Sequence, residues 1–295
     1  MTELRLFEID DHKIGTLLLN PGVQGEPVIF LHGITASLHA WVGSSVKFPE
    51  TLGPCYSVSL PGHYPAAFPE GFNTNMLTPE MIAEVLAKAI RQLTSGKPAT
   101  LIGHSTGGFS ALAVAIYHPE LVRRVVSVSG FAQGRWTGAL GFYQNLVRSG
   151  ATGTTIFKSL FRSVRRYRLL RAVMRIYAAD VPALYRNPEL DDMVRASLPD
   201  FCSLDLDAMA MYFQVMPNTD ITHLLHKISV PVLAMVGDRD PTVPPEQAHV
   251  IVEHIQGAEL AVFNGAGHLI STERPEDYQT ILSKWLAQNS WKNSG

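Results

Sequence analysis

A serine enclosed by glycines is the part of the chain best suited to carry out chemistry. Residues 103–107 read Gly-His-Ser-Thr-Gly and lie between an apolar run, Ala99–Ile102, and a stretch of small apolar residues that reaches Tyr117. A sharp strand-to-helix turn needs glycines because the backbone folds tightly around the serine and lifts its hydroxyl above the edge of the sheet. The pattern therefore predicts that Ser105 is a nucleophile.

A serine hydroxyl needs a base, and the base needs an acid to orient it. His268 ends the sequence Asn-Gly-Ala-Gly-His at 264–268, after the last predicted strand. The loop after the preceding strand reads Gly-Asp-Arg-Asp-Pro at 237–241 and offers Asp238 and Asp240. We predict that Asp240, which lies further into the loop, is the acid, and that Asp238 is structural or exposed. The order Ser, Asp, His along the chain is typical of one hydrolase architecture.

Negative charge that develops on a substrate oxygen needs fixed hydrogen-bond donors. One predicted donor is the backbone N–H of Thr106, directly after the serine, and the other is that of Ile34, in the turn His-Gly-Ile at 32–34. Removing one such donor costs about 3 kcal/mol of transition-state stabilisation. These two amides are the predicted oxyanion hole.

Three further side chains are candidates for the substrate pocket. His39 and Trp41 follow the His-Gly-Ile turn, although packing in the core is an equally good interpretation of the tryptophan. His104, inside the serine turn, is expected to pack against its neighbours rather than to react. His223 and His226 have a spacing that a metal could use, but no third ligand or HExxH pattern accompanies them. We expect no metal and no cofactor.

The elements that must position these residues alternate along the chain. Short apolar or alternating runs predict strands at 4–9, 14–19, 28–31, 55–60, 99–102, 125–129, 230–236 and 260–263. Three- and four-residue apolar spacing and helix-capping signals predict helices at 79–94, 107–117, 246–255 and 275–288. Repeated strand–helix alternation predicts an α/β fold with a mostly parallel sheet covered by helices on both faces.

The interval 131–227 differs from the rest because it carries helical patterns and no convincing strand. We interpret it as an inserted helical cap, which leaves 1–130 and 228–295 as the catalytic domain. Seven cations lie from Lys158 to Arg175 with no acid among them. The same segment carries two apolar stripes that are rotated apart, one of Phe157, Leu160, Phe161 and Val164 and one of Leu170, Val173, Met174 and Tyr177. We expect a break near Tyr167 and two short amphipathic helices, each with a basic outer face. Such a face is either solvated or docks on an anionic membrane or acidic substrate.

Taken together, these motifs resemble the α/β-hydrolase superfamily, in particular its members with a helical cap between the sixth and seventh core strands. The matching segments are the His-Gly turn, GHSTGG, GDRDPTVP and GAGH. The resemblance implies the α/β-hydrolase fold and a serine hydrolase. It also implies the same roles as the residues do: Ser105 as nucleophile, Asp240 as acid, His268 as base, and the Ile34 and Thr106 amides as oxyanion hole.

Composition limits the other possibilities. Hydrophobic residues make up 46% and charged residues 17% of the 295 residues, which excludes a disordered chain. A formal charge of −2 argues against a polycation that binds nucleic acid. Two cysteines indicate no disulfide framework, and neither a signal peptide nor a membrane-spanning run is expected, so we predict a cytoplasmic protein. The sequence does not indicate an oligomeric state.

The leading functional hypothesis is hydrolysis of a carboxylic ester, of a small molecule or a lipid, through an acyl-enzyme. The same residues also serve thioester cleavage and hydrolysis of a C–C bond. A ligand receptor with little turnover is the alternative from another class, because a fold alone does not determine function.

Overall fold

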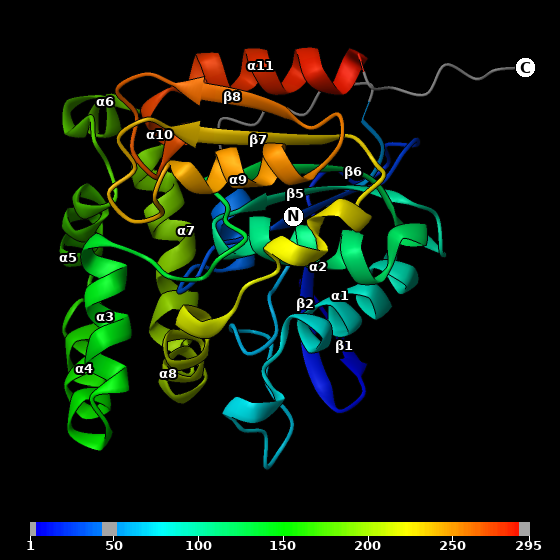
Figure 1. Ribbon diagram of the computed structural model, residues 1–295. Helices are drawn as coiled ribbons and strands as arrows, with labels where there is room; N and C mark the ends of the chain where they lie inside the picture. The colour runs from blue at the N-terminus through cyan, green and yellow to red at the C-terminus, as the bar shows by residue number, and fades with distance from the viewer. Residues whose placement is uncertain (1–3, 43–51, 289–295) are drawn as a thin grey trace, which may run out of the picture.

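A central sheet organises the part of the chain that the computed structural model describes, residues 4–42 and 52–288. Its strands are β1 (Leu4–Ile9), β2 (His12–Leu18), β3 (Val28–Leu31), β4 (Cys55–Val58), β5 (Ala99–His104), β6 (Val122–Val128), β7 (Val232–Gly237) and β8 (Glu259–Phe263). They lie in the order β1-β2-β4-β3-β5-β6-β7-β8 (Figure 1). β2 is antiparallel to β1 and β4, and the other neighbours are parallel. The predicted mostly parallel sheet is confirmed.

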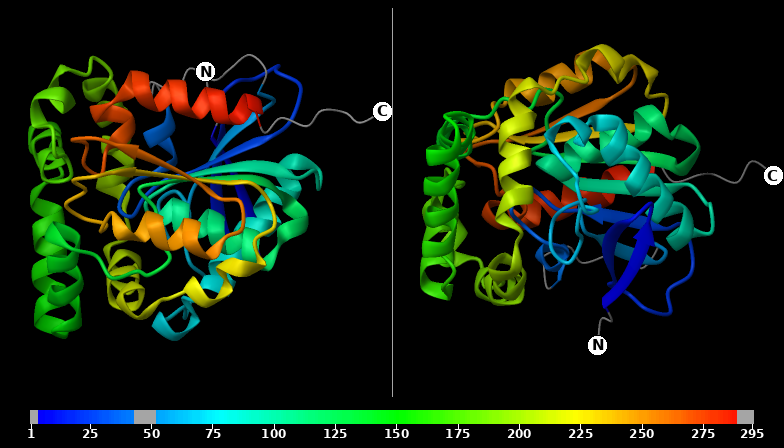
Figure 2. Two further views of the ribbon diagram at one scale, coloured as in Figure 1. Left: turned by 45° about the horizontal axis from the view of Figure 1, so that its top comes forward. Right: turned by 90° about the horizontal axis from the view of Figure 1, so that it is seen from below.

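Helices cover both faces of this sheet. α1 (Pro79–Thr94), α2 (Thr106–Tyr117) and α9 (Glu246–His254) lie on one face, and α11 (Pro275–Gln288) lies on the other (Figures 1 and 2). Each helix face buries the apolar side chains that its sequence spaces at helical intervals. The parallel strands are consequently buried on both sides, which explains their uninterrupted apolar runs.

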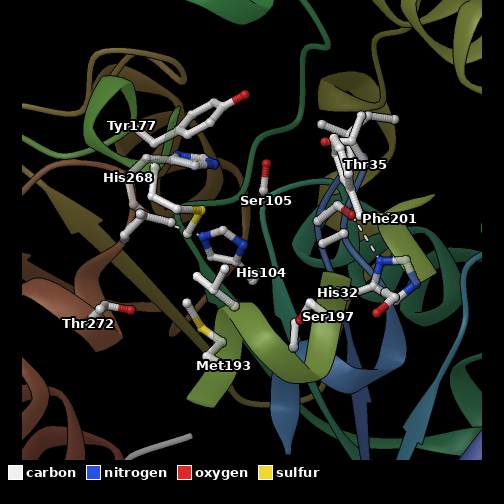
Figure 3. A pocket seen from close by; sticks show the side chains of 18 of the residues that line it. His32, Thr35, His104, Ser105, Tyr177, Met193, Ser197, Phe201, His268 and Thr272 are labelled. Carbon is white, nitrogen blue, oxygen red and sulfur yellow. Dashed lines mark hydrogen bonds between the residues drawn. The ribbon is translucent and has the colours of Figure 1, made fainter. Parts of the chain in front are cut away.

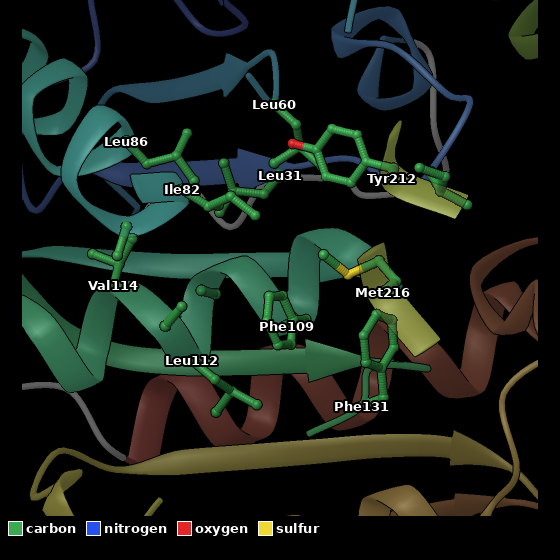
Figure 4. Close-up of a cluster of buried hydrophobic side chains, with 14 of the residues drawn as sticks. Leu31, Leu60, Ile82, Leu86, Phe109, Leu112, Val114, Phe131, Tyr212 and Met216 are labelled. Carbon is green, nitrogen blue, oxygen red and sulfur yellow. The ribbon is translucent and has the colours of Figure 1, made fainter. Parts of the chain in front are cut away.

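The packing of α1 and α2 holds the serine turn in place. Thr78 caps α1 by accepting a hydrogen bond from the N–H of Met81 at 3.1 Å. The buried stripe of α1 includes Ile82 and Leu86, and α2 contributes Phe109 to the same core cluster (Figure 4). α2 is buried on almost every side. A helix in that position cannot shift without disturbing the core, so its N-terminal end is a rigid support.

Strand boundaries differ from the predicted ones by a few residues, for local reasons. β6 begins at Val122, three residues before the predicted start at 125. The prediction missed these residues because Arg124, which is buried inside the strand, interrupts the apolar run. Its guanidinium donates to Glu26 Oε1 at 2.8 Å and to the carbonyl of Leu286 at 2.8 Å. A charged residue interrupts the apolar pattern from which a buried strand is predicted. In the folded protein, the hydrogen bonds to Glu26 and Leu286 stabilise the buried guanidinium of Arg124.

The chain between β6 and β7 forms helices. They are α3 (Gly138–Arg148), α4 (Ala151–Ser163), α5 (Tyr167–Val173), α6 (Val181–Arg186), α7 (Leu190–Ser203) and α8 (Leu206–Val215). α3–α7 stand beyond the carboxyl ends of β7 and β8 (Figure 1). The predicted break near Tyr167 is confirmed. The domain boundaries at 131 and 227 stay a prediction, and residues 1–3, 43–51 and 289–295 of the predicted catalytic domain lie outside the described residues.

The outer surface of α4 and α5 is less uniformly basic than the sequence predicts. Lys158 pairs with Asp207, and Arg171 pairs with Asp191 at 2.5 Å. Leu160, predicted to belong to the apolar stripe of α4, is 38% exposed. The buried side of α4 is formed by Gly153, Phe157 and Phe161 instead. Within the described ranges, no helix is both long and apolar enough to cross a membrane.

Candidate active site

The serine turn has the strained geometry that its glycines predict. Ser105 joins β5 to α2 with a φ of 55°, a backbone conformation that residues other than glycine rarely adopt. A Cβ on Gly103 would lie 2.1 Å from the carbonyl oxygen of Gly107, and one on Gly107 would lie 2.2 Å from that of Leu31. Neither position can accept a larger residue without moving backbone. The turn is held by the hydrogen bond from Ser105 N–H to Val128 O at 2.8 Å.

His268 and Asp240 are brought together by the loops that follow β8 and β7. The distance from His268 Nδ1 to Asp240 Oδ2 is 2.6 Å, and both side chains are buried. Because a carboxylate only accepts hydrogen bonds, the imidazole carries its proton on Nδ1 and leaves Nε2 free to accept one. This is the tautomer that a general base needs.

The second oxygen of Asp240 is anchored by its own loop. Oδ1 accepts from the Thr242 N–H and hydroxyl, both at 2.8 Å, and from the Val243 N–H at 2.9 Å. Burial by itself raises the pKa of this carboxyl, but its attraction to the protonated form of His268 and the hydrogen bonds from His268, Val243 and Thr242 outweigh it and hold the pKa below its usual range. Asp240 is therefore an anion with a fixed orientation at neutral pH.

Ser105 and His268 face the same cavity. Figure 3 shows the hydroxyl of Ser105 and the ring of His268 both extending into it. Ser105 Oγ is buried and makes no hydrogen bond within the described ranges, so the two side chains are neighbours without a direct bond. Bonds between a nucleophile and its base are often long in a free enzyme and shorten when substrate binds.

The His-Gly-Ile turn lies directly against the serine turn. A Cβ on Gly33 would be 3.1 Å from His104 Nδ1 and 3.2 Å from Ser105 Cβ. His32 braces this turn, because its Nδ1–H donates to the carbonyl of Gly33 and its Nε2 accepts from the N–H of Leu60. Burial lowers the pKa of His32 to about 4, so it is neutral. Ile34 lines the cavity, and Thr106 begins α2 beside Ser105; the oxyanion role of their amides stays a prediction.

Two of the three predicted pocket residues line the cavity. They are Trp41 and His104, whereas His39 is not on the lining. The Nδ1–H of His39 donates to Asp200 of α7 at 2.5 Å, which ties the loop after β3 to the cap. His104 packs beside His268, with ring centroids 4.8 Å apart, and its Nε2–H donates to the carbonyl of His268 at 3.0 Å. Burial, followed by repulsion from the protonated form of His268, lowers the pKa of His104 to about 4.

The cap supplies about half of the residues that line the cavity, and none of them was predicted as a pocket residue. The volume is about 220 Å³, and the apolar lining from the cap consists of Leu140, Tyr143, Phe161, Val164, Leu170, Val173, Met174, Tyr177, Leu190, Met193, Val194 and Phe201. Among the described residues on the lining, none is lysine or arginine, and Glu189 contributes a carboxylate. The apolar stripes near 157–164 and 170–177 were the available signal, but periodicity alone cannot distinguish a cavity wall from a core.

Comparison with known proteins agrees with this fold. Residues 26–275 match the family described as alpha/beta hydrolase fold. The chain is 29% identical over 263 residues to a pimeloyl-(acyl-carrier protein) methyl ester esterase of Neisseria meningitidis serogroup C, which covers 88% of this chain and 93% of that protein. It is 24% identical over 270 residues to a 2-hydroxy-6-oxononadienedioate/2-hydroxy-6-oxononatrienedioate hydrolase of Burkholderia vietnamiensis, over 90% of this chain and 88% of that protein.

Solved structures share the fold. An esterase from Exiguobacterium antarcticum superposes with a TM-score of 0.75 at 21% identity, over 97% of this chain and 100% of that one. The enol-lactonase from Burkholderia xenovorans LB400 superposes with a TM-score of 0.74 at 18% identity, over 96% and 100% of the two chains.

Proposed function

Because this chain belongs to the alpha/beta hydrolase fold family and is a hydrolase, we propose that it cleaves an uncharged carboxylic ester with an apolar acyl group. Ser105, His268 and Asp240 are the proposed nucleophile, base and acid. The single observation that carries the proposal is the 2.6 Å bond between His268 and Asp240 at the wall of an apolar cavity that Ser105 also lines.

The proposed reaction has two steps. Ser105 Oγ attacks the ester carbonyl carbon while His268 Nε2 takes its proton, and the resulting oxyanion accepts hydrogen bonds from the Ile34 and Thr106 amides. The C–O bond to the alcohol then breaks, and His268 gives the proton to the departing alkoxide. Water next attacks the acyl-enzyme, with His268 as base, and releases the carboxylic acid and free Ser105.

The cavity favours an apolar, uncharged acyl group. An engineered apolar cavity of roughly 150 Å³ binds benzene, so the volume of about 220 Å³ has room for a somewhat larger group. A substrate with a carboxylate inside the cavity would face Glu189 and no lysine or arginine among the described lining residues. For this reason an ester is proposed ahead of a dienedioate such as the one named for the Burkholderia vietnamiensis relative.

A chain-length series of p-nitrophenyl esters, from acetate to dodecanoate, tests the proposal. We expect turnover with an optimum above acetate, and no turnover by the Ser105→Ala variant. Release of one equivalent of p-nitrophenol with nothing afterwards would favour a receptor with little turnover. Inactivity on every ester, together with cleavage of a thioester or of a C–C bond, would move the proposal to that reaction.

The cap surface supports a second proposal, about where the enzyme meets its substrate. The segment 156–176, which contains α5 and most of α4, carries exposed cations that make no ion pair with another described residue, and also exposed apolar side chains: Arg162, Arg166, Arg168 and Arg175, and Ile156, Leu160, Leu169 and Ile176. Each cation near an anionic membrane contributes about 1 kcal/mol. We propose that the exposed side of the segment 156–176 docks on anionic lipid.

Co-sedimentation with vesicles tests this docking. The wild type is expected to bind vesicles that contain phosphatidylglycerol and not vesicles of phosphatidylcholine alone. Replacing Arg166, Arg168 and Arg175 by glutamine should release it, whereas the same change at three exposed cations elsewhere, Lys97, Arg135 and Lys227, should not. Equal binding by both triple variants, or none by the wild type, would contradict the proposal.

A further inference from the structure

A buried glutamate lies beside the candidate base and has no part in the mechanism above. Glu273 ends the short helix α10 (Ile270–Glu273) and is 3% exposed. Both of its carboxylate oxygens lie 3.0–3.1 Å from the N–H of Gly267, and Oε1 also accepts from the N–H of Leu269 at 3.3 Å. Gly267 and Leu269 are the residues immediately before and after His268. One carboxylate therefore holds the backbone on both sides of the base.

The same carboxylate also holds the cap. Oε2 of Glu273 accepts from the N–H of Ala179 at 2.9 Å and from that of Asp180 at 2.8 Å. This cap segment lies tightly against the loop of the base, because a Cβ on Gly267 would be 2.4 Å from the Ala179 nitrogen. Four backbone N–H groups from two distant parts of the chain thus converge on one buried anion.

The backbone of His268 itself is fixed from other directions. Its N–H donates to the carbonyl of Tyr177 at 2.8 Å. Its carbonyl accepts from His104 Nε2–H and from the Ser129 hydroxyl, both at 3.0 Å. With Glu273 holding the two flanking N–H groups, the loop has little freedom to rotate the imidazole away from Ser105.

The geometry points to Glu273 as a positioning residue: we propose that it holds His268 through the N–H groups on either side of the base and fixes that loop to the cap segment Ala179–Asp180. The inference rests on the proposed role of His268. A carboxylate suits this place because both oxygens accept. An amide of the same shape would turn its NH₂ toward backbone N–H groups and leave buried donors without acceptors.

The Glu273→Gln variant, compared with Glu26→Gln, tests the proposal. Glu26 is a matched control because its carboxylate also receives hydrogen bonds, from Thr100 and Arg124, and lies before the amino end of β3, at the opposite edge of the sheet from His268. For Glu273→Gln we expect kcat on a short p-nitrophenyl ester to fall about 10- to 100-fold, with KM changed by less than about threefold, because a small misplacement of a reacting group has that effect. Glu26→Gln should lose stability and keep kcat.

A spectroscopic readout separates positioning from general destabilisation. The proton shared by His268 and Asp240 is strongly deshielded in proton NMR, and we expect its resonance to shift or broaden in Glu273→Gln and to stay in place in Glu26→Gln. The Glu273→Asp variant keeps a carboxylate with a shorter reach, so it should recover part of kcat. It also provides the measurement if the glutamine variant does not fold.

Two results would overturn the proposal. One is full kcat in either folded Glu273 variant, with the resonance unmoved. The other is an equal loss of kcat in Glu26→Gln. Failure of the proposed function would look different, because the wild type itself would then lack Ser105-dependent turnover.

Discussion

Replacing Asp240 by asparagine should disable the enzyme by selecting the wrong tautomer of His268. Oδ1 of Asp240 accepts from two backbone N–H groups and one hydroxyl, of Thr242 and Val243. In the variant, the amide oxygen would keep this position because an NH₂ group there would face those donors. The NH₂ group must then point at His268 Nδ1, which can only accept. The imidazole proton consequently moves to Nε2, where a proton from Ser105 can no longer be taken.

The magnitude follows from the same contacts. Turning the amide the other way loses two backbone hydrogen bonds of about 1 kcal/mol each, so the productive orientation is held by roughly 3% of molecules or fewer. The variant also loses the anion that stabilises the protonated imidazole in the transition state. In a serine protease the equivalent change lowers kcat by about 10⁴-fold. We expect about 10³- to 10⁴-fold here, which is about 4–5.5 kcal/mol of barrier.

Steady-state kinetics on p-nitrophenyl butyrate measure the effect, with Asp238→Asn as the matched control. Asp238 lies two residues earlier in the same loop and is exposed, and its Oδ1 accepts from the N–H of Gly265. The control should keep kcat within about threefold of the wild type, as expected of a surface change. An Asp240→Asn variant that is folded and retains kcat within about tenfold would refute the tautomer argument.

Three other predictions concern pH, stability and specificity. The wild type should lose stability between pH 7 and pH 5, because the histidine at 104 binds a proton there when unfolded, with a pKa of 6.5, and does not when buried, with a pKa of about 4. In His104→Gln this loss, measured by urea unfolding, should be smaller by about 2 kcal/mol. Arg124→Met should cost about 3 kcal/mol of unfolding free energy by leaving Glu26 short of a partner, with kcat unchanged; an unaltered urea midpoint would contradict this. Val194→Phe should fill part of the cavity and lower kcat/KM for decanoate more than for acetate, and an equal effect on both esters would argue against an acyl-binding role.

The fold could be predicted from the sequence because local signals agreed with one another. Glycines are needed around Ser105 because neighbouring backbone atoms leave no room for a Cβ. Thr78 and Pro79 mark the start of α1, and the buried strands have short apolar runs as their sequences. The neighbouring loops that carry Asp240 and His268 follow adjacent parallel strands, β7 and β8, so their meeting at one edge of the sheet was predictable from topology.

The remaining features depend on contacts between distant residues, which leave little trace in local sequence. In the sequence, Glu273 is an ordinary acid two residues before Pro275. Its hydrogen bond with Ala179 depends on the folding of the distant cap segment against it. His39 looked like a pocket residue because it follows the predicted oxyanion turn, but Asp200, far along the chain, binds it. The cap residues that line the cavity could not be predicted for a similar reason, since an apolar residue such as Val194 faces a cavity in one fold and a core in another.

The most direct test of the account is the rate at which a fluorophosphonate labels Ser105 in the wild type and in His268→Ala, followed by intact mass and peptide mapping. We expect one adduct per wild-type molecule, located on Ser105, and labelling of His268→Ala at least about 100-fold slower, because the hydroxyl is a weak nucleophile without its base. Equal labelling rates in the two proteins, or an adduct at another residue while Ser105 stays unmodified, would contradict it.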